Sequence, residues 1–81
     1  MKTIYLIKDL AQITGLSIYT IKYYLKIGLI TEFGRSPSTN FRYFDDSSVN
    51  RLHLIRQLRN EGKPLKTIKL ILNEAKTTAN K

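Results

Sequence analysis

Residues 7–28 read IKDLAQITGLSIYTIKYYLKIG, and this stretch decides the fold. Apolar side chains in its first third recur at the i, i+3 and i+4 spacing of one helix face, which predicts a helix over residues 6–14. Gly15 ends that helix, and Ser17 is a favoured N-cap for a second helix over residues 18–27. The short, glycine-containing connection between the two predicted helices is typical of a helix-turn-helix.

The second predicted helix has two unlike faces. Its apolar face carries Ile18, Ile21, Tyr24 and Leu25, whereas the opposite face carries Tyr19, Lys22, Tyr23 and Lys26. Solvated faces usually mix acids with lysines, but no acid occurs in residues 18–27. Lysines interleaved with tyrosines therefore favour a surface that contacts phosphates and bases over an ordinary solvated face.

The next segment predicts a β-hairpin. Residues 29–33 and 41–44 are rich in aromatic and β-branched side chains, and the intervening sequence, GRSPSTN, is typical of a loop. Alternation places Phe41 and Tyr43 on one face and Arg42 and Phe44 on the other. We expect Arg42 at an exposed edge, since an arginine is rarely buried in a core.

Two more helices complete the predicted domain. Asp45 is a favoured N-cap for a helix over residues 46–60, and Pro64 suits the first turn of a fourth helix. The apolar stripes of these helices consist of Val49, Leu52, Ile55 and Leu58, and of Leu65, Ile68, Ile71, Leu72 and Ala75. We expect one mainly α domain over residues 1–76, with element order α-α-β-β-α-α, followed by a flexible tail over residues 77–81.

Composition supports this interpretation and narrows the function. The chain has 81 residues, enough for one domain, and no cysteine, which excludes disulfides and thiolate metal sites. Its formal net charge of +8 favours polyanions, nucleic acid first among them. The first residues lack the features of a secretory signal, and no apolar run is long enough for a membrane helix, so we expect a cytoplasmic protein associated with the nucleoid.

The residues that most often carry catalysis or bind metals have simpler explanations here. His53 is the only histidine, and with no cysteine beside it we expect a half-buried packing residue and no zinc site. Asp45 and Asp46 stand at a helix start, where they act as cap and dipole partners. Because no phosphate loop or nucleophile motif occurs either, we expect no enzyme, no cofactor and no metal.

Several segments, in order, resemble one known family. They are residues 7–17, 20–24, 27–30, 41–45 and 55–62, followed by Leu65 and Ile68. From about Tyr5 to Leu72 the chain resembles the amino-terminal domain of MerR-type regulators. The resemblance implies a winged helix-turn-helix with its second helix in the major groove and its wing along the backbone, commonly as a two-fold dimer.

The resemblance also implies roles for individual residues. Tyr19 and Lys22 match positions that contact bases or phosphates, Tyr23 a position that touches the DNA backbone, and Arg42 the wing arginine that binds phosphate. The complete candidate set is Ser17, Tyr19, Thr20, Lys22, Tyr23, Lys26, Arg35, Arg42 and Tyr43. Family members often carry arginine at positions 19 and 22, and its absence here weakens the usual bidentate recognition of guanine.

Other departures concern helix starts, the wing and the length of the chain. Asn40 replaces a common wing glycine, and Leu6 and Pro64 stand where caps are common. Regulators of this type continue into a long dimerising helix and an effector domain, whereas about nine residues follow Leu72 here. A natural minimal member and a fragment of a longer protein both fit, and we expect a monomer in solution that pairs, if at all, on a palindromic DNA site.

Three functions are consistent with the sequence. The first is a sequence-specific regulator of transcription on double-stranded DNA, and the second is an excisionase-like or architectural DNA-binding factor. The third is a protein-interaction module with a docking patch of Tyr19, Tyr23, Phe33 and Phe44. A further set of cations, Arg51, Arg56, Arg59, Lys63, Lys66 and Lys69, is either a solvated face or a second phosphate contact.

Overall fold

The protein is four helices and one antiparallel hairpin, as the sequence predicts. The structure, a computed structural model, describes the backbone of residues 4–79 and the side chains of residues 4–73. The elements in chain order are α1 (Ile7–Thr14), α2 (Ile18–Lys26), β1 (Gly34–Arg35), β2 (Arg42–Tyr43), α3 (Asp46–Asn60) and α4 (Leu65–Ala79). The mainly α winged helix-turn-helix is therefore confirmed.

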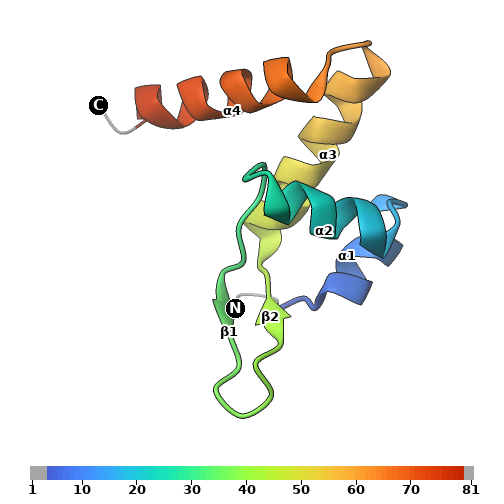
Figure 1. Ribbon diagram of the computed structural model, residues 1–81, viewed down its shortest axis with the longest axis vertical. Coiled ribbons are helices and arrows are strands. Elements are labelled where there is room, and N and C mark those ends of the chain that lie inside the picture. The colour runs from blue at the N-terminus through green and yellow to red at the C-terminus, as the bar shows by residue number, and fades with distance from the viewer. Residues whose placement is uncertain (1–3, 80–81) are drawn as a thin grey trace.

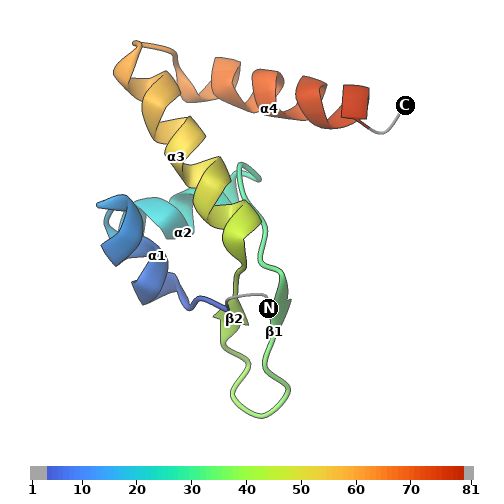
Figure 2. The same ribbon diagram turned by 180° about the vertical axis from the view of Figure 1, so that it is seen from behind.

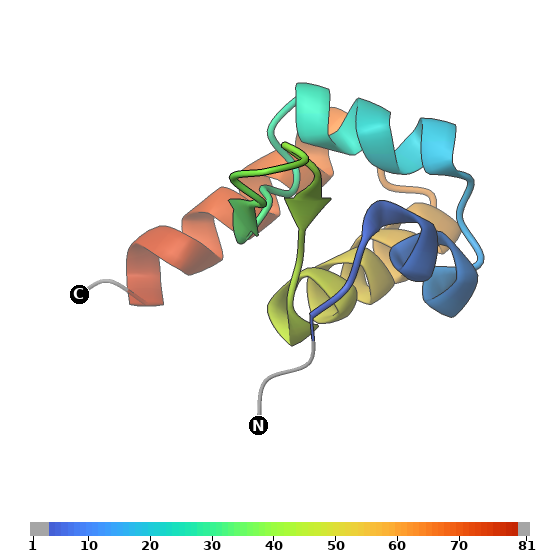
Figure 3. The same ribbon diagram turned by 90° about the horizontal axis from the view of Figure 1, so that it is seen from below.

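The helices pack together and the hairpin projects from them as a wing. In Figure 1 the wing extends away from the helices at one end of the molecule, while α4 lies at the opposite end. Helix α2 lies in front of α3 in this view, and from behind α3 lies in front of α2 (Figure 2). Seen from below, β2 lies between α2 and the start of α3 (Figure 3). One face of α2 is thus packed against the domain, and the other faces away from α3.

Local chemistry explains where the helices begin and end. Gly15 adopts φ 76°, the left-handed conformation that ends α1 at little cost for glycine. Ser17 Oγ accepts a hydrogen bond from Thr20 N at 3.0 Å, and Asp45 Oδ1 accepts one from Ser47 N at 3.1 Å. Leu6 has no cap side chain, but Asp9 Oδ2 accepts from the Leu6 backbone N–H at 2.8 Å. Asp9 thus satisfies a backbone donor at this atypical helix start.

The hairpin pairs further along the chain than the sequence predicts. Residues 29–33 form no strand, and β1 lies inside the segment expected to be loop, with Gly34 paired to Tyr43 and Arg35 to Arg42. Leu29 and Ile30 are instead buried in the core, 0% and 2% exposed. The expected first strand is wrong because the core holds these two side chains, and pairing begins only where the chain leaves the core.

The amino-terminal segment adds a contact that the sequence did not predict. Tyr5 N donates to Phe44 O at 2.8 Å and Phe44 N donates to Tyr5 O at 2.7 Å, forming an isolated antiparallel bridge just beyond β2. The Tyr5 hydroxyl also donates to Asp46 Oδ1 at 2.8 Å. The segment before α1 is therefore held against both the base of the wing and the start of α3.

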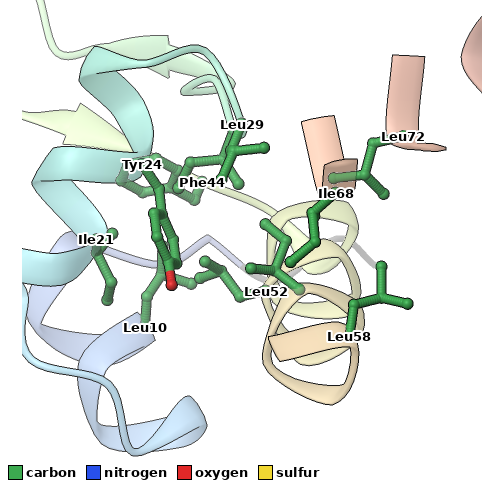
Figure 4. Packing of buried hydrophobic residues seen from close by; sticks show 11 residues of the cluster. Leu10, Ile21, Tyr24, Leu29, Phe44, Leu52, Leu58, Ile68 and Leu72 are labelled. Carbon is green, nitrogen blue, oxygen red and sulfur yellow. The ribbon is translucent and has the colours of Figure 1, made fainter. Parts of the chain in front are cut away.

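One core joins the four helices to residues 29–30 and to Phe44, which follows β2 (Figure 4). Its buried hydrophobic residues are Leu10, Ile21, Tyr24, Leu29, Ile30, Phe44, Leu52, Ile55, Leu58, Ile68 and Leu72. Phe44 is 0% exposed, so it takes no part in a docking patch, and the patch proposed with Tyr19, Tyr23 and Phe33 is wrong in that member. Arg42, by contrast, has a side chain that is 41% exposed, as expected for the edge of the wing.

Three expectations about the helix faces need correction. Ile18 is 41% exposed and Ile71 is 36% exposed, although both belong to predicted apolar stripes. Ile18 occupies the first turn of α2, which reaches beyond the core, and Ile71 lies at the border of the buried stripe of α4. His53 is exposed, not half-buried, because it projects from the side of α3 away from Leu52. The core role predicted for Ala75 lies outside the described side chains.

The arginines of α3 bind backbone carbonyls. Arg56 Nη1 donates to Thr14 O at the end of α1, and Arg51 Nε donates to Leu29 O just after α2. Arg59 Nη1 donates to Lys63 O at 3.2 Å, in the connection to α4. Burial lowers the pKa of Arg51 from its ordinary value, yet a guanidinium stays charged in proteins. These contacts give the three arginines a structural role as ties between α3 and its neighbours.

Helix α4 extends further than the sequence predicts, and the domain boundary expected at residue 76 stays a prediction. The helix continues through Ala79, past residue 76, because Thr77, Thr78 and Ala79 include no helix breaker. Residues 80 and 81 lie outside the described residues. The flexibility expected of residues 77–81 stays a prediction.

The arginine ties predict a selective loss of stability. Replacing Arg56 by Met keeps the aliphatic stem but leaves the Thr14 carbonyl without its charged donor. We expect Arg56→Met to lower the free energy of unfolding by about 1–3 kcal/mol in urea titration, the range for a hydrogen bond to a charged group. Arg59→Met is the matched control, since its bond is exposed, and it should cost under about 1 kcal/mol. Equal losses in the two variants would contradict the tie between α3 and α1.

Candidate nucleic-acid interface

The outward face of α2 is exposed, basic and aromatic, as the helical periodicity predicts. Tyr19 is 81% exposed and Tyr23 44%, and Lys22 and Lys26 are exposed beside them. Tyr23 also contacts the buried Tyr24, with ring centroids 6.4 Å apart. This face therefore offers two cations and two phenol hydroxyls to a partner, while its opposite side is anchored in the core.

Two other candidates, Ser17 and Thr20, hold the start of α2. Ser17 Oγ accepts from the backbone N–H of Thr20 and lies 2.8 Å from Thr20 Oγ1, to which it donates. The two hydroxyls are thus engaged with each other and with the first turn. Their immediate effect is to set the direction of α2 and of Tyr19, which follows in the first turn.

Within the wing, Tyr43 shapes the hairpin. Its ring packs against Phe33 with centroids 5.8 Å apart, and its hydroxyl lies over Gly34. A Cβ at position 34 would lie 2.5 Å from Tyr43 Oη, so only glycine fits without displacing the ring. Asn40 closes the loop with φ 61°, and its N–H donates to Ser36 O at 2.7 Å. Asparagine tolerates this left-handed conformation in place of glycine.

A groove of about 590 Å³ lies between the start of α1, α2 and the wing. Four cations line it, Lys8, Lys22, Arg35 and Arg42, together with Leu6, Ile7, Asn40 and Phe41. The structure thus brings together one predicted helix residue and both predicted wing arginines. Ser17, Tyr19, Thr20, Tyr23, Lys26 and Tyr43 do not line the groove.

Sequence reasoning missed Lys8. The signal that could have found it is its position in the first turn of α1, where the helix dipole favours acids and disfavours cations. A lysine placed there is unfavourable for the helix by itself. Its presence beside Lys22, Arg35 and Arg42 is explained if the groove receives an anion.

Glu32 is the acid that sequence reasoning also missed. Its Oε2 lies 3.2 Å from Arg35 Nε and its Oε1 lies 3.6 Å from Arg42 Nε, so each carboxylate oxygen faces one wing arginine. The pKa of Glu32 lies below its ordinary value, chiefly because its own backbone donates a hydrogen bond to the carboxylate. Desolvation raises this pKa, while the Arg35 and Arg42 guanidiniums lower it further. The carboxylate therefore stays ionised at neutral pH.

A second groove, of about 540 Å³, lies between α3, α4 and residues 28–31. Its lining contains a single cation, Arg51, whose Nε already donates to Leu29 O. Serine and leucine side chains make up much of the rest, including Ser47, Ser48 and Leu54. The concentration of positive charge thus distinguishes the groove beside α2 from this one.

The described part of the chain has neither a candidate membrane span nor a candidate metal site. Within residues 4–79 no helix is long and apolar enough to cross a membrane. Nor do histidines and acids there come together in a group of three or more that could hold a metal ion.

Comparisons with known proteins agree on one family. The sequence profile of the MerR HTH family regulatory proteins matches residues 5–75. The chain is 41% identical over 66 residues to a probable heavy metal-dependent transcriptional regulator of Haemophilus influenzae, covering 82% of this chain and 51% of that protein. It is 35% identical over 65 residues to the Multidrug-efflux transporter 1 regulator of Bacillus subtilis, covering 80% of this chain and 23% of that protein.

A solved structure has the same fold with related sequence. HiNmlR, a MerR family regulator lacking the sensor domain and bound to promoter DNA, superposes with a TM-score of 0.81 at 33% identity. The match covers 90% of this chain and 55% of that one. The chain therefore spans about half the length or less of these relatives.

The charge pairs of the wing predict how Glu32 titrates. Its carboxyl should protonate below the ordinary glutamate value of about 4.3 in a pH titration followed by carboxyl-carbon NMR. Because the pKa is depressed in the folded protein, the stability it contributes is present above the ordinary pKa and is lost as pH falls through the folded pKa. In the double variant Arg35→Gln/Arg42→Gln the midpoint should rise toward the ordinary value. An unchanged midpoint would show that the arginines do not act on Glu32.

Proposed function

The chain belongs to the MerR family of helix-turn-helix regulatory proteins, and from this premise we propose that it binds double-stranded DNA sequence-specifically and regulates transcription. The observation that carries the proposal is the groove in which Lys8, Lys22, Arg35 and Arg42 meet beside the exposed face of α2. Clustered cations neutralise backbone phosphates and release condensed counterions, which supplies much of the affinity of DNA-binding proteins.

In this proposal α2 enters the major groove. Tyr19 and Lys22 lie in its first turns, the part of a recognition helix that reaches base edges, and the Tyr19 side chain is 81% exposed. Tyr23 and Lys26 follow toward the end of the helix and contact backbone. Lys22 belongs both to the outward face of α2 and to the lining of the groove.

The wing contacts phosphates and carries no base readout. Arg35 and Arg42 lie opposite each other on the two strands, so both follow the same stretch of backbone. Guanidinium groups bind phosphate oxygens in well-defined geometry, which positions the protein on the duplex without specifying sequence. Tyr43 supports this contact indirectly by packing on Gly34 and Phe33.

Assembly and location follow from the same proposal. Residues 1–76 act as the DNA-binding unit, and two copies pair on a palindromic site whose half-sites lie about one helical turn apart, roughly 34–36 Å. HiNmlR supports action without a sensor domain, because that regulator lacks one and was solved on promoter DNA. A regulator working in this way acts in the cytoplasm at the nucleoid, with no cofactor and no metal.

Salt dependence tests the electrostatic part of the proposal. If Lys8, Lys22, Arg35 and Arg42 each contact a phosphate, log affinity should fall with log salt with a slope of about −0.9 per contact. Fluorescence anisotropy on a random duplex from low to moderate salt measures the slope. A flat response would rule out phosphate binding as the source of affinity.

A pair of variants distinguishes base recognition by α2 from phosphate binding by the wing. Lys22→Ala should cost roughly 1–3 kcal/mol on the preferred site and relax the preference at one base position. Arg42→Ala should weaken preferred and random duplexes alike and reduce the salt slope by about one contact. Selection on randomised half-sites, with wild type and each variant, makes the comparison. A changed motif with Arg42→Ala and an unchanged one with Lys22→Ala would reverse the two assignments.

A further inference from the structure

The two wing arginines face each other across the hairpin. Arg35 on β1 is the direct register partner of Arg42 on β2. Like charges placed directly opposite in an antiparallel pair are destabilising. The hairpin therefore needs an anion near these two guanidiniums, whether or not a partner is bound.

Glu32 supplies that anion. Its two carboxylate oxygens divide between the arginines, at 3.2 Å from Arg35 Nε and 3.6 Å from Arg42 Nε. The Glu32 side chain is 28% exposed, less than the 44% of Arg35 and the 41% of Arg42. Both arginines also line the cationic groove, where a phosphate would approach from the solvent side.

A carboxylate and a phosphate cannot both use the same Nε donors. Glu32 Oε2 accepts a hydrogen bond from Arg35 Nε and Glu32 Oε1 forms an ion pair with Arg42 Nε, so the carboxylate lies where phosphate oxygens would approach these donors, and two anions side by side repel each other. This inference rests on the proposed DNA binding. We propose that Glu32 competes with the DNA phosphate from within the protein, because its carboxylate already pairs with Arg35 and Arg42 before DNA binds. Glu32 thereby sets the affinity and the salt dependence of the wing contact.

The proposal predicts a gain of affinity when the competitor is removed. Glu32→Gln keeps the size of the side chain but removes its charge. Exposed ion pairs are weak, so releasing two of them corresponds to an increase in DNA affinity of about three- to tenfold at low salt. Glu32 cancels one unit of the positive charge that the two arginines bring to the DNA backbone, so its removal should steepen the salt slope by about 0.9, the increment for one unit of charge.

Glu61→Gln is the matched control. Glu61 follows α3, its side chain is exposed, and its Oε1 pairs with Lys63 Nζ at 3.7 Å. The substitution changes the net charge by the same amount, but at a position that lines neither groove. Screening limits the reach of an exposed charge to about 8–10 Å at moderate salt, so Glu61→Gln should change affinity less than twofold and leave the slope unaltered.

A double-variant cycle shows whether Glu32 acts through the arginines. In the background Arg35→Gln/Arg42→Gln, the added change Glu32→Gln should give no further gain on the same duplex. Circular dichroism before each titration establishes that every variant is folded. Anisotropy with one fluorescent duplex at several salt concentrations provides all the affinities.

The experiment has four distinguishable outcomes. A three- to tenfold gain with Glu32→Gln that disappears in the arginine-free background supports internal competition. Unchanged or weaker binding by Glu32→Gln overturns it and leaves the proposed function intact, since wild type still binds. A gain that persists without the arginines also overturns it, because removal of general repulsion then explains the effect. If wild type itself shows no DNA binding at low salt, the proposed function fails and this inference fails with it.

Discussion

The burial of Phe44 is the constraint on which the rest of the structure depends. Its side chain is 0% exposed, in the same part of the core as Tyr24 and Leu29 (Figure 4). Its backbone exchanges two hydrogen bonds with Tyr5, and the next residue, Asp45, caps α3. One residue thus joins the base of the wing to the amino-terminal segment, to the back of α2 and to the start of α3. Because the wing is anchored there, Arg42 is held at a set distance from α2.

The helices could be predicted from the sequence because their determinants are local. Caps such as Ser17 and Asp45 and terminators such as Gly15 act within a few residues, and the structure places the helix ends within about one residue of the expected bounds, except at α4. The hairpin could not be placed so well, since its register depends on the core taking up Leu29 and Ile30. Propensity marks residues 29–33 as strand-like, but tertiary packing uses them otherwise.

The residues of the candidate site also differ in whether local sequence or tertiary packing determines their role. The outward face of α2 follows from helical geometry alone, so Tyr19, Lys22, Tyr23 and Lys26 were correctly expected to be exposed. Lys8 and Glu32 were missed because their roles arise only when segments far apart in sequence meet. The net charge, by contrast, overstates the number of cations that are available to bind a partner. Arg51 and Arg56 contribute to the basic balance, yet each donates to a backbone carbonyl inside the domain.

The groove collects three features that are unfavourable for the free protein. Lys8 places a cation in the first turn of a helix, Arg35 faces Arg42 across the hairpin, and Asn40 holds a left-handed backbone without being glycine. All four of these residues line the same groove. Proteins tend to break local rules at functional sites and to compensate elsewhere. Here the compensation is visible, since the Phe44 anchor and the arginine ties of α3 hold the framework while Glu32 neutralises part of the repulsion. These unfavourable features lie together in one groove, which supports a role of the groove in binding an anionic partner. This support does not depend on the net charge of the chain.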